Sequence, residues 1–220
     1  MSFSFNGNTP RKIIFNNQDV KKLIYNNDVV WEKKRLPVEY QEVEYIESTG
    51  TQYINTNYTP VQGDNIKIEK VKQADNNNDG VLFSAGNGTY QLILYCQRNY
   101  PTYWKYFATG YAESFYSPLS DFTEINIIDG KIYYDNVIKA TSKYSGQVDT
   151  ALQLFRRASE INYISATMGR FTITNGNTIK LDLIPCYKKS NNEIGFYDII
   201  NDVFYANQGT GTFIKGPDVN

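Results

Sequence analysis

The chain has 220 residues, of which 41% are hydrophobic and 15% aromatic, with 19 Tyr and 12 Phe. This apolar content can build the core of one large domain, or of one medium domain with a small appendage. The formal net charge of −1 gives no long-range attraction to nucleic acid or to anionic membranes, and the absence of histidine excludes histidine-dependent catalytic triads and the common zinc sites.

The first residues, MSFSFNGNTPRK, lack the apolar segment of a secretory signal, and no apolar run approaches the ~20 residues of a transmembrane helix. We therefore expect neither a cleaved signal nor a membrane span. If the protein acts outside a bacterium, we expect it to leave the cell by another route, such as lysis.

The first thirty-five residues contain a short repeat with an offset of ten residues. IIFNNQDV begins at Ile13 and LIYNNDVV begins at Leu23, and each has an Asn-Asn pair after an aromatic residue. Because Asn tolerates positive φ, these pairs predict hairpin turns within a small β-meander. A segment of this size cannot bury a core of its own, so it is either an attachment module or a set of strands added to the next domain.

A charged run, EKKR at residues 32–35, is followed by Leu36 and Pro37. The charges and the proline interrupt the apolar pattern and disfavour a continuous strand or helix. We predict a domain boundary here, with an attachment module at residues 1–35 and a larger domain at residues 36–220.

The larger domain shows strand patterns almost throughout. IKIEKV alternates apolar and polar residues from Ile66, whereas YQLILYC at residues 90–96 is apolar on both faces, as in a central strand of a sandwich. The pairs Asp129-Gly130 and Asn175-Gly176 predict hairpin turns between later strands. The pattern predicts an all-β sandwich of the jelly-roll type, with two packed sheets.

Two cysteines, Cys96 and Cys186, lie inside apolar strand-like runs. Such positions favour reduced, buried thiols, although a disulfide between them is an alternative.

The densest group of carboxylates is EVEYIE, with Glu42, Glu44 and Glu47. In an extended strand, Glu42 and Glu44 would project from one face about 7 Å apart, a separation suited to sugar hydrolysis. The motif is similar to the Glu-x-Asp-x-Glu strand of jelly-roll glucanases, but Glu44 replaces the Asp. A solvated outer face, with Val43 and Tyr45 turned inward, explains the pattern better, so we expect no catalytic residue.

The segment DNNNDG resembles the first half of an EF-hand loop, with candidate Ca²⁺ ligands at Asp75, Asn77 and Asp79. The second half of that motif is missing, because Gly86 stands where the loop would need Glu. A hydrophilic turn is the simpler interpretation, and no cofactor other than Ca²⁺ is indicated.

The segment from residue 100 to residue 116 is unusually aromatic. Tyrosine and tryptophan faces stack on the apolar faces of sugars, so a polar loop rich in them is a candidate glycan or protein contact. We predict that Tyr100, Tyr103 and Trp104 are exposed and bind carbohydrate, while other aromatics in the segment pack inward. Arg156 and Arg157 lie in no pattern that assigns them a role.

Two end segments carry a family resemblance. VEYIESTGTQYINTNYTP at residues 43–60 is similar to the opening strands of a concanavalin A-like (laminin G-like) lectin/glucanase-fold domain. That version occurs in structural proteins of phages and prophages and in some Bacteroides surface proteins. Residues 168–217 resemble its closing strands, with a Gly-x-Tyr-Asp turn from Gly195 to Asp198, a Phe-Tyr-x-Asn run from Phe204, and a final Gly-Thr-Gly-Thr-Phe run. The resemblance covers about residues 38–217.

The resemblance implies a non-enzymatic domain displayed on a virion or a cell surface. Our leading hypothesis is a bacteriophage tail, baseplate or appendage protein, made in the host cytoplasm and displayed on the virion. It implies binding to host-surface glycan, attachment to other virion proteins through the N-terminal module, and a homo-oligomer that gains from multivalency. The alternative is a structural or decoration protein that binds virion proteins and no sugar, and a carboxylate-dependent glycoside hydrolase comes third. The family supplies no binding residues, so none is transferred.

Overall fold

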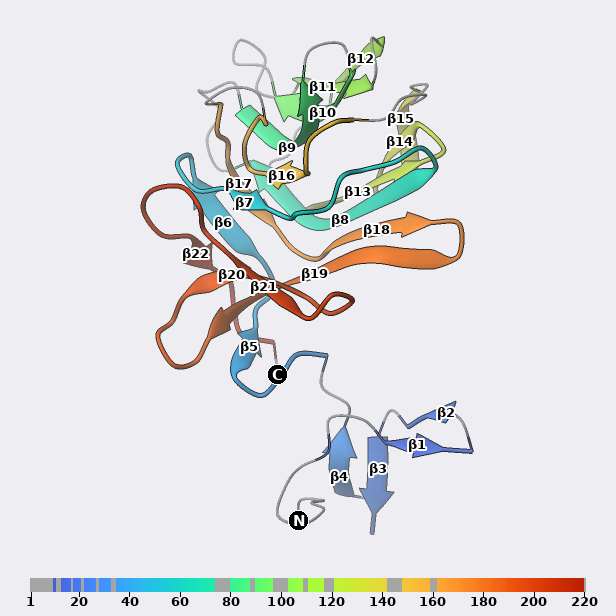
Figure 1. The fold of residues 1–220 in the computed structure, drawn as a ribbon, viewed down its shortest axis with the longest axis vertical. Coiled ribbons are helices and arrows are strands. Elements are labelled where there is room, and N and C mark those ends of the chain that lie inside the picture. Colours follow the sequence, from blue (N-terminus) through green and yellow to red (C-terminus); the bar gives the residue numbers. More distant parts are fainter. Residues whose placement is uncertain are drawn as a thin grey trace. The chain divides into compact units, whose positions relative to one another are not determined.

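The computed structural model describes residues 10, 13–16, 18–20, 22–26, 28–32, 35–73, 80–87, 90–96, 103–108, 111–116, 121–141, 148–158 and 162–219. The chain divides into two compact units, Met1–Tyr40 and Gln41–Asn220 (Figure 1). Among the described residues, all of the regular secondary structure consists of strands, which confirms the predicted all-β class. None of these residues forms a helix long and apolar enough to cross a membrane.

The strands are, in chain order, β1 (Ile14–Phe15), β2 (Gln18–Asp19), β3 (Lys22–Tyr25), β4 (Asp28–Glu32), β5 (Tyr40–Glu42), β6 (Ile46–Thr49), β7 (Ile54–Asn55), β8 (Asp64–Gln73), β9 (Gly80–Asn87), β10 (Tyr90–Cys96), β11 (Tyr103–Ala108), β12 (Tyr111–Tyr116), β13 (Thr123–Ile128), β14 (Lys131–Tyr134), β15 (Val137–Thr141), β16 (Gln153–Leu154), β17 (Ser165–Met168), β18 (Phe171–Asn175), β19 (Thr178–Lys188), β20 (Ile194–Asp198), β21 (Val203–Ala206) and β22 (Ile214–Lys215).

The N-terminal unit contains two hairpins, β1 with β2 and β3 with β4. Asn16 and Asn26 both have φ of 49°, as the repeated Asn-Asn pairs predict. Each hairpin is a separate two-stranded sheet, so a continuous meander is not seen among the described residues. The same two positions of each repeat are exposed, Ile14 and Phe15 in the first hairpin and Ile24 and Tyr25 in the second.

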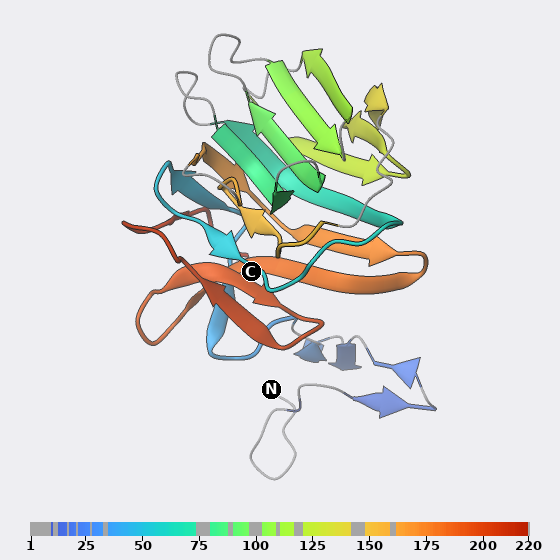
Figure 2. The same ribbon diagram turned by 45° about the horizontal axis from the view of Figure 1, so that its top comes forward.

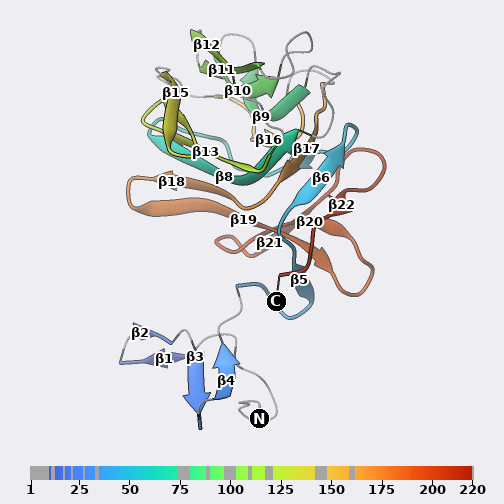
Figure 3. The ribbon, with the colours of Figure 1, turned by 180° about the vertical axis from the view of Figure 1, so that it is seen from behind.

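The larger unit contains two antiparallel sheets. The smaller has the order β12-β11-β10-β9-β16-β7, and the larger runs β15-β14-β13-β8-β18-β19-β20-β21. Four more strands branch from the larger sheet: β5 pairs with β19, β17 pairs with β8 and β6, and β22 pairs with β6. Figure 2 shows the green strands of the smaller sheet on one side of the orange strands β18 and β19. From behind, β13, β8, β18 and β19 follow one another in the order of the larger sheet (Figure 3).

The core lies between the two sheets. Phe83 of β9 meets Phe171 of β18 edge to face, with 6.1 Å between the ring centroids. Ile66 and Ile68 on β8 are buried, as the alternation predicts, and the central strand β10 is buried on both faces at Leu92, Ile93 and Leu94. The turn at Asp129-Gly130 adopts positive φ at both residues, which closes the predicted hairpin between β13 and β14.

The closing Gly-Thr-Gly-Thr-Phe run packs against residues 51 and 52. Gln52 is buried, accepts a hydrogen bond from the backbone N–H of Thr49 at 2.8 Å and donates one to the carbonyl of Thr212 at 3.3 Å. A Cβ at Gly209 would lie 2.0 Å from the carbonyl oxygen of Thr51, so only glycine fits this approach. The run is therefore part of the fold's closure.

Both cysteines are free and buried, which confirms the predicted reduced thiols. The Cys96 thiol donates to Gln73 Oε1 at 3.2 Å. Burial raises the pKa of the Cys186 thiol to about 12.

Candidate functional site

The structure tests only part of the predicted aromatic site. Tyr100 lies outside the described residues. Tyr103 is the first residue of β11, opposite Tyr116, and its side chain also lies outside the described part of the structure. Trp104 has no exposed surface, so its predicted exposure was wrong. It occupies the inward-facing position of β11 and packs in the core, because one residue along a strand moves a side chain to the other face.

The predicted calcium ligands Asp75, Asn77 and Asp79 lie outside the described residues. Within the part of the chain that the structure describes, no three His, Cys, Asp or Glu side chains gather to hold a metal ion.

The carboxylates of EVEYIE separate along the chain. Glu42 ends β5, Glu47 lies within β6, and Glu44 between them is exposed, with an oxygen 3.4 Å from Lys70 Nζ. Val43 is buried, as expected, and Tyr45 is partly buried against Phe122. These features fit the solvated face that the sequence favours.

A different group of residues converges where β7 and β16 meet. Gln153 of β16 lies opposite Asn55 of β7, and the chain turns sharply after β16 at Phe155, which has φ of 64°. Left-handed backbone is rare for a bulky residue and marks a turn held by its surroundings. We call this group the Arg156 cluster, which comprises Tyr53, Gln153, Arg156, Arg157 and Tyr163.

The Arg156 guanidinium lies over two tyrosine rings. Its Cζ is 4.5 Å from the ring centroid of Tyr53 and 5.7 Å from that of Tyr163, and the two centroids are 6.2 Å apart. A guanidinium at these distances is attracted to the negative faces of the rings, which holds it in place while its edge keeps hydrogen-bond donors. Arg156 also pairs with Tyr163 in an isolated antiparallel bridge.

The segment that carries Arg156 is fastened to β9 through Ser84. The Ser84 hydroxyl donates to the Arg156 carbonyl at 3.0 Å and accepts from the backbone N–H of Ala158 at 2.6 Å. Ser84 is opposite Gln153 in the sheet, so the segment lies along the same strands as the rest of the cluster. Arg157 Nη2 donates to Gln91 Oε1 of β10 at 3.4 Å, which extends the cluster to a fourth strand.

Arg156 Nε and Gln153 Oε1, both in the cluster, are buried without a hydrogen-bond partner. One is a donor and the other an acceptor, and both belong to partly exposed residues. Unpaired buried polar atoms cost free energy, so they need an explanation in a folded protein. Neither atom is accessible to solvent, so a ligand would contact the less buried Nη edge of the Arg156 guanidinium rather than these two atoms.

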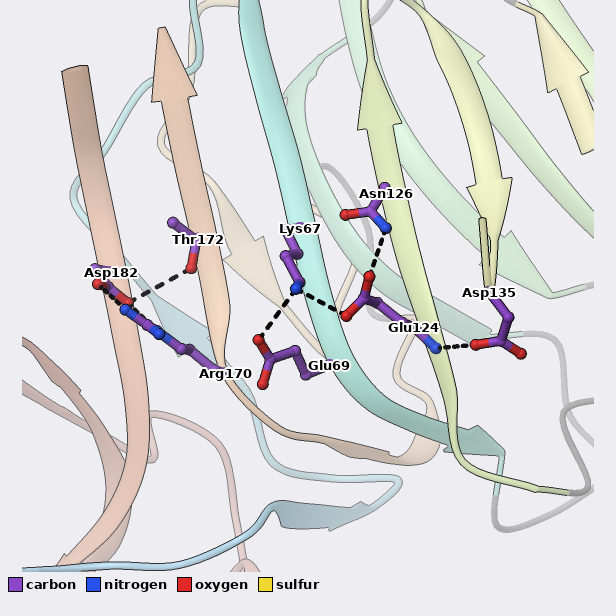
Figure 4. Close-up of polar contacts among 8 residues, drawn as sticks. All are labelled: Lys67, Glu69, Glu124, Asn126, Asp135, Arg170, Thr172 and Asp182. Carbon is purple, nitrogen blue, oxygen red and sulfur yellow. Dashed lines mark hydrogen bonds and ion pairs between the residues drawn. The ribbon is translucent and has the colours of Figure 1, made fainter. Parts of the chain in front are cut away.

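The outer face of the larger sheet is also polar, but its charges are compensated (Figure 4). Lys67 Nζ lies 2.8 Å from Glu124 and 3.5 Å from Glu69, and hydrogen bonding to Glu124 raises the pKa of Lys67. Arg170 donates two hydrogen bonds to Asp182, at 2.6 and 2.5 Å, and this bonding raises the pKa of Arg170. This face therefore has the internal pairing of a solvated surface. One row across it contains Asn126, Lys67, Thr172 and Asp182 in register.

Comparison with solved structures supports the fold. A structure of a candidate carbohydrate binding protein from Bacteroides ovatus superposes with a TM-score of 0.55 at 13% sequence identity, over 81% of this chain and 62% of that one. The larger unit has a lectin-like jelly-roll fold. A heptameric pentraxin from Limulus polyphemus, described as SAP-like, gives a TM-score of 0.45 at 11% identity over 60% of this chain and 76% of its own.

No protein-family model and no curated protein sequence matches the chain. The chain spans less than two thirds of the Bacteroides ovatus protein, and at this identity the likeness shows the fold alone.

Sequence reasoning missed the Arg156 cluster. Tyr53 and Arg156 are far apart in the chain, and nothing in the segment 43–60 that contains Tyr53 points to Arg156. The antiparallel pairing of β16 with β7 places the chain segments next to these two residues side by side. A run of two arginines in a chain rich in tyrosine was the one available signal, and it does not point to a partner.

Proposed function

We propose that the larger unit binds carbohydrate and that the Arg156 cluster is its contact surface. The observation that carries the proposal is the guanidinium of Arg156 held over the rings of Tyr53 and Tyr163 in a partly exposed position. Sugars have apolar C–H faces that stack on aromatic rings, and hydroxyl groups that both accept and donate hydrogen bonds. The lectin-like fold supports this proposal, because the Bacteroides ovatus protein of similar fold is described as a candidate carbohydrate binder.

A glycan array with multimerised protein tests the proposal, and calorimetric titration with each positive glycan gives the affinity. Replacing Tyr53 by Ala removes one ring beneath Arg156, so we expect at least about a tenfold loss of affinity, since stacking contributes on the order of 1–3 kcal/mol. Tyr133→Ala is the matched control, because Tyr133 is also partly buried and lies opposite Asn126 in the larger sheet. Silence across the array, or equal binding by the two variants, would refute the proposal.

We further propose that the protein is a bacteriophage tail, baseplate or appendage protein and that it has no enzymatic activity. The resemblance of residues 43–60 and 168–217 to phage-borne jelly rolls supports this role. Multivalent display as a homo-oligomer would strengthen weak single sites. Locating the protein on intact particles by cryo-electron microscopy tests the virion role, and absence from the particle would contradict that role.

Calorimetric titration with Ca²⁺ tests the proposed ligands Asp75, Asn77 and Asp79, and a flat trace would remove them.

The alternative is a structural virion protein that binds other virion proteins and no sugar. The observation that favours it is the exposure of Ile14, Phe15, Ile24 and Tyr25 at equal positions of two repeated hairpins. Apolar residues exposed in this repeated way mark a protein contact more often than a sugar site. Phe15→Ser with Tyr25→Ser should then abolish incorporation into particles, whereas Arg156→Gln should leave incorporation unchanged.

A further inference from the structure

We propose that the Arg156 cluster selects sugars that carry a carboxylate, the uronic acids. This inference rests on the proposed carbohydrate binding and adds the chemical class of the ligand. It depends on the charge of the cluster rather than on its aromatic rings.

Arg156 is partly buried and has no carboxylate within 4.0 Å among the ion pairs of the described residues. Removing a cation from water without a counter-charge is unfavourable, and ring faces compensate only part of that cost. A bound anion would provide the missing compensation.

Arg170 of the same chain shows how a partly buried guanidinium can obtain a counter-charge and hydrogen-bond acceptors. Arg170 is also partly buried, with 31% of its side chain exposed, and it holds the Asp182 carboxylate by two parallel hydrogen bonds. The planar fork of arginine matches a carboxylate in this bidentate manner. Arg156 has the same planar group without a carboxylate partner, and its Nη edge is less buried than its Nε, so a ligand carboxylate can bind at that edge.

The rest of the cluster suits the neutral part of such a sugar. Tyr53 and Tyr163 are both partly exposed, so the ring surface that Arg156 leaves uncovered can contact the C–H groups. Arg157 adds a second arginine next to Arg156, and none of the other cluster members carries a carboxylate.

Calorimetric titration with matched pairs of ligands tests this inference. The probes are trimers of galacturonate, glucuronate and mannuronate, each as the free acid and as its uncharged methyl ester. We expect at least one acid to bind about tenfold or more tightly than its ester, since hydrogen bonds to charged groups are about twice as strong as neutral ones. We also expect this preference to weaken as NaCl is added.

Arg156→Gln should abolish the preference for the acid, and Arg156→Lys should restore only part of it, because lysine keeps the charge without the planar fork. Lys131→Gln makes the same change in net charge at an exposed position of β14 and should leave the preference intact. Thermal melts of the three variants check that each is folded.

Binding of neutral glycans with no acid preference, or an acid preference that survives Arg156→Gln, overturns the inference and leaves the proposed carbohydrate binding in place. Failure to bind any glycan, acidic or neutral, removes both.

Discussion

Removing one partner of the ion pair between Arg170 and Asp182 should strongly destabilise the larger sheet. Asp182 is 1% exposed, and Arg170 donates to both of its oxygens. Arg170→Met keeps an unbranched chain of similar reach but removes the positive charge and both hydrogen bonds. The substitution leaves a buried carboxylate without its counter-charge.

The cost follows from the burial of the two partners. Breaking a fully buried pair by removing one partner costs about 3–5 kcal/mol. Here the side chain of Arg170 remains 31% exposed, so water can reach part of the site and the cost should be near the lower limit, about 3 kcal/mol. Lys67→Met is the matched control on the same face, because Lys67 is 45% exposed and its pairs with Glu69 and Glu124 should contribute less than about 1 kcal/mol.

Urea unfolding followed by tryptophan fluorescence gives the free energy of unfolding of both variants. A double-mutant cycle with Asp182→Leu then isolates the coupling between Arg170 and Asp182, which we expect to be about 2–3 kcal/mol after the same allowance for exposure. A loss below about 1 kcal/mol in Arg170→Met, or an equal loss in Lys67→Met, would refute the reasoning from burial.

Three further predictions concern the core and the closing strands. Trp104→Ala should cost about 3–5 kcal/mol in urea unfolding because the side chain is fully buried, and native Trp104 should resist iodide quenching. Gly209→Ala should destabilise by about 1–3 kcal/mol, because its Cβ would overlap a backbone carbonyl, whereas Thr210→Ala at the adjacent exposed position should change stability by less than about 0.5 kcal/mol. Burial raises the pKa of Cys186 to about 12, so folding favours the protonated thiol. This preference contributes to the free energy of unfolding in full below the unfolded pKa of about 8.5, and the contribution is lost as pH rises above that value. Urea unfolding across this alkaline range should show a smaller fall in stability for Cys186→Ala than for the parent chain, and equal slopes would contradict the assignment.

Local patterns in the chain predicted the strands and turns well, because both depend on neighbouring residues. Alternation from Ile66 placed Ile66 and Ile68 in the core, and Asp129-Gly130 closed a hairpin with positive φ at both residues. The same kind of reasoning failed at Trp104. An aromatic-rich segment without alternation does not reveal which residues face inward, and a shift of one residue reverses the face.

The Arg156 cluster shows the limit of local patterns. Nothing near Arg156 in the sequence identifies Tyr53 as its neighbour, because that contact arises from the pairing of β16 with β7. The all-β class, the hairpin turns and the buried thiols follow from short-range conformational preference and from the apolar pattern. By contrast, short-range preferences do not decide which polar side chains remain unpaired. That outcome depends on every group that folding brings within hydrogen-bond distance. Arg170 and Arg156 are both arginines in a β sandwich, and only the folded chain gives a carboxylate to the first and two tyrosine rings to the second.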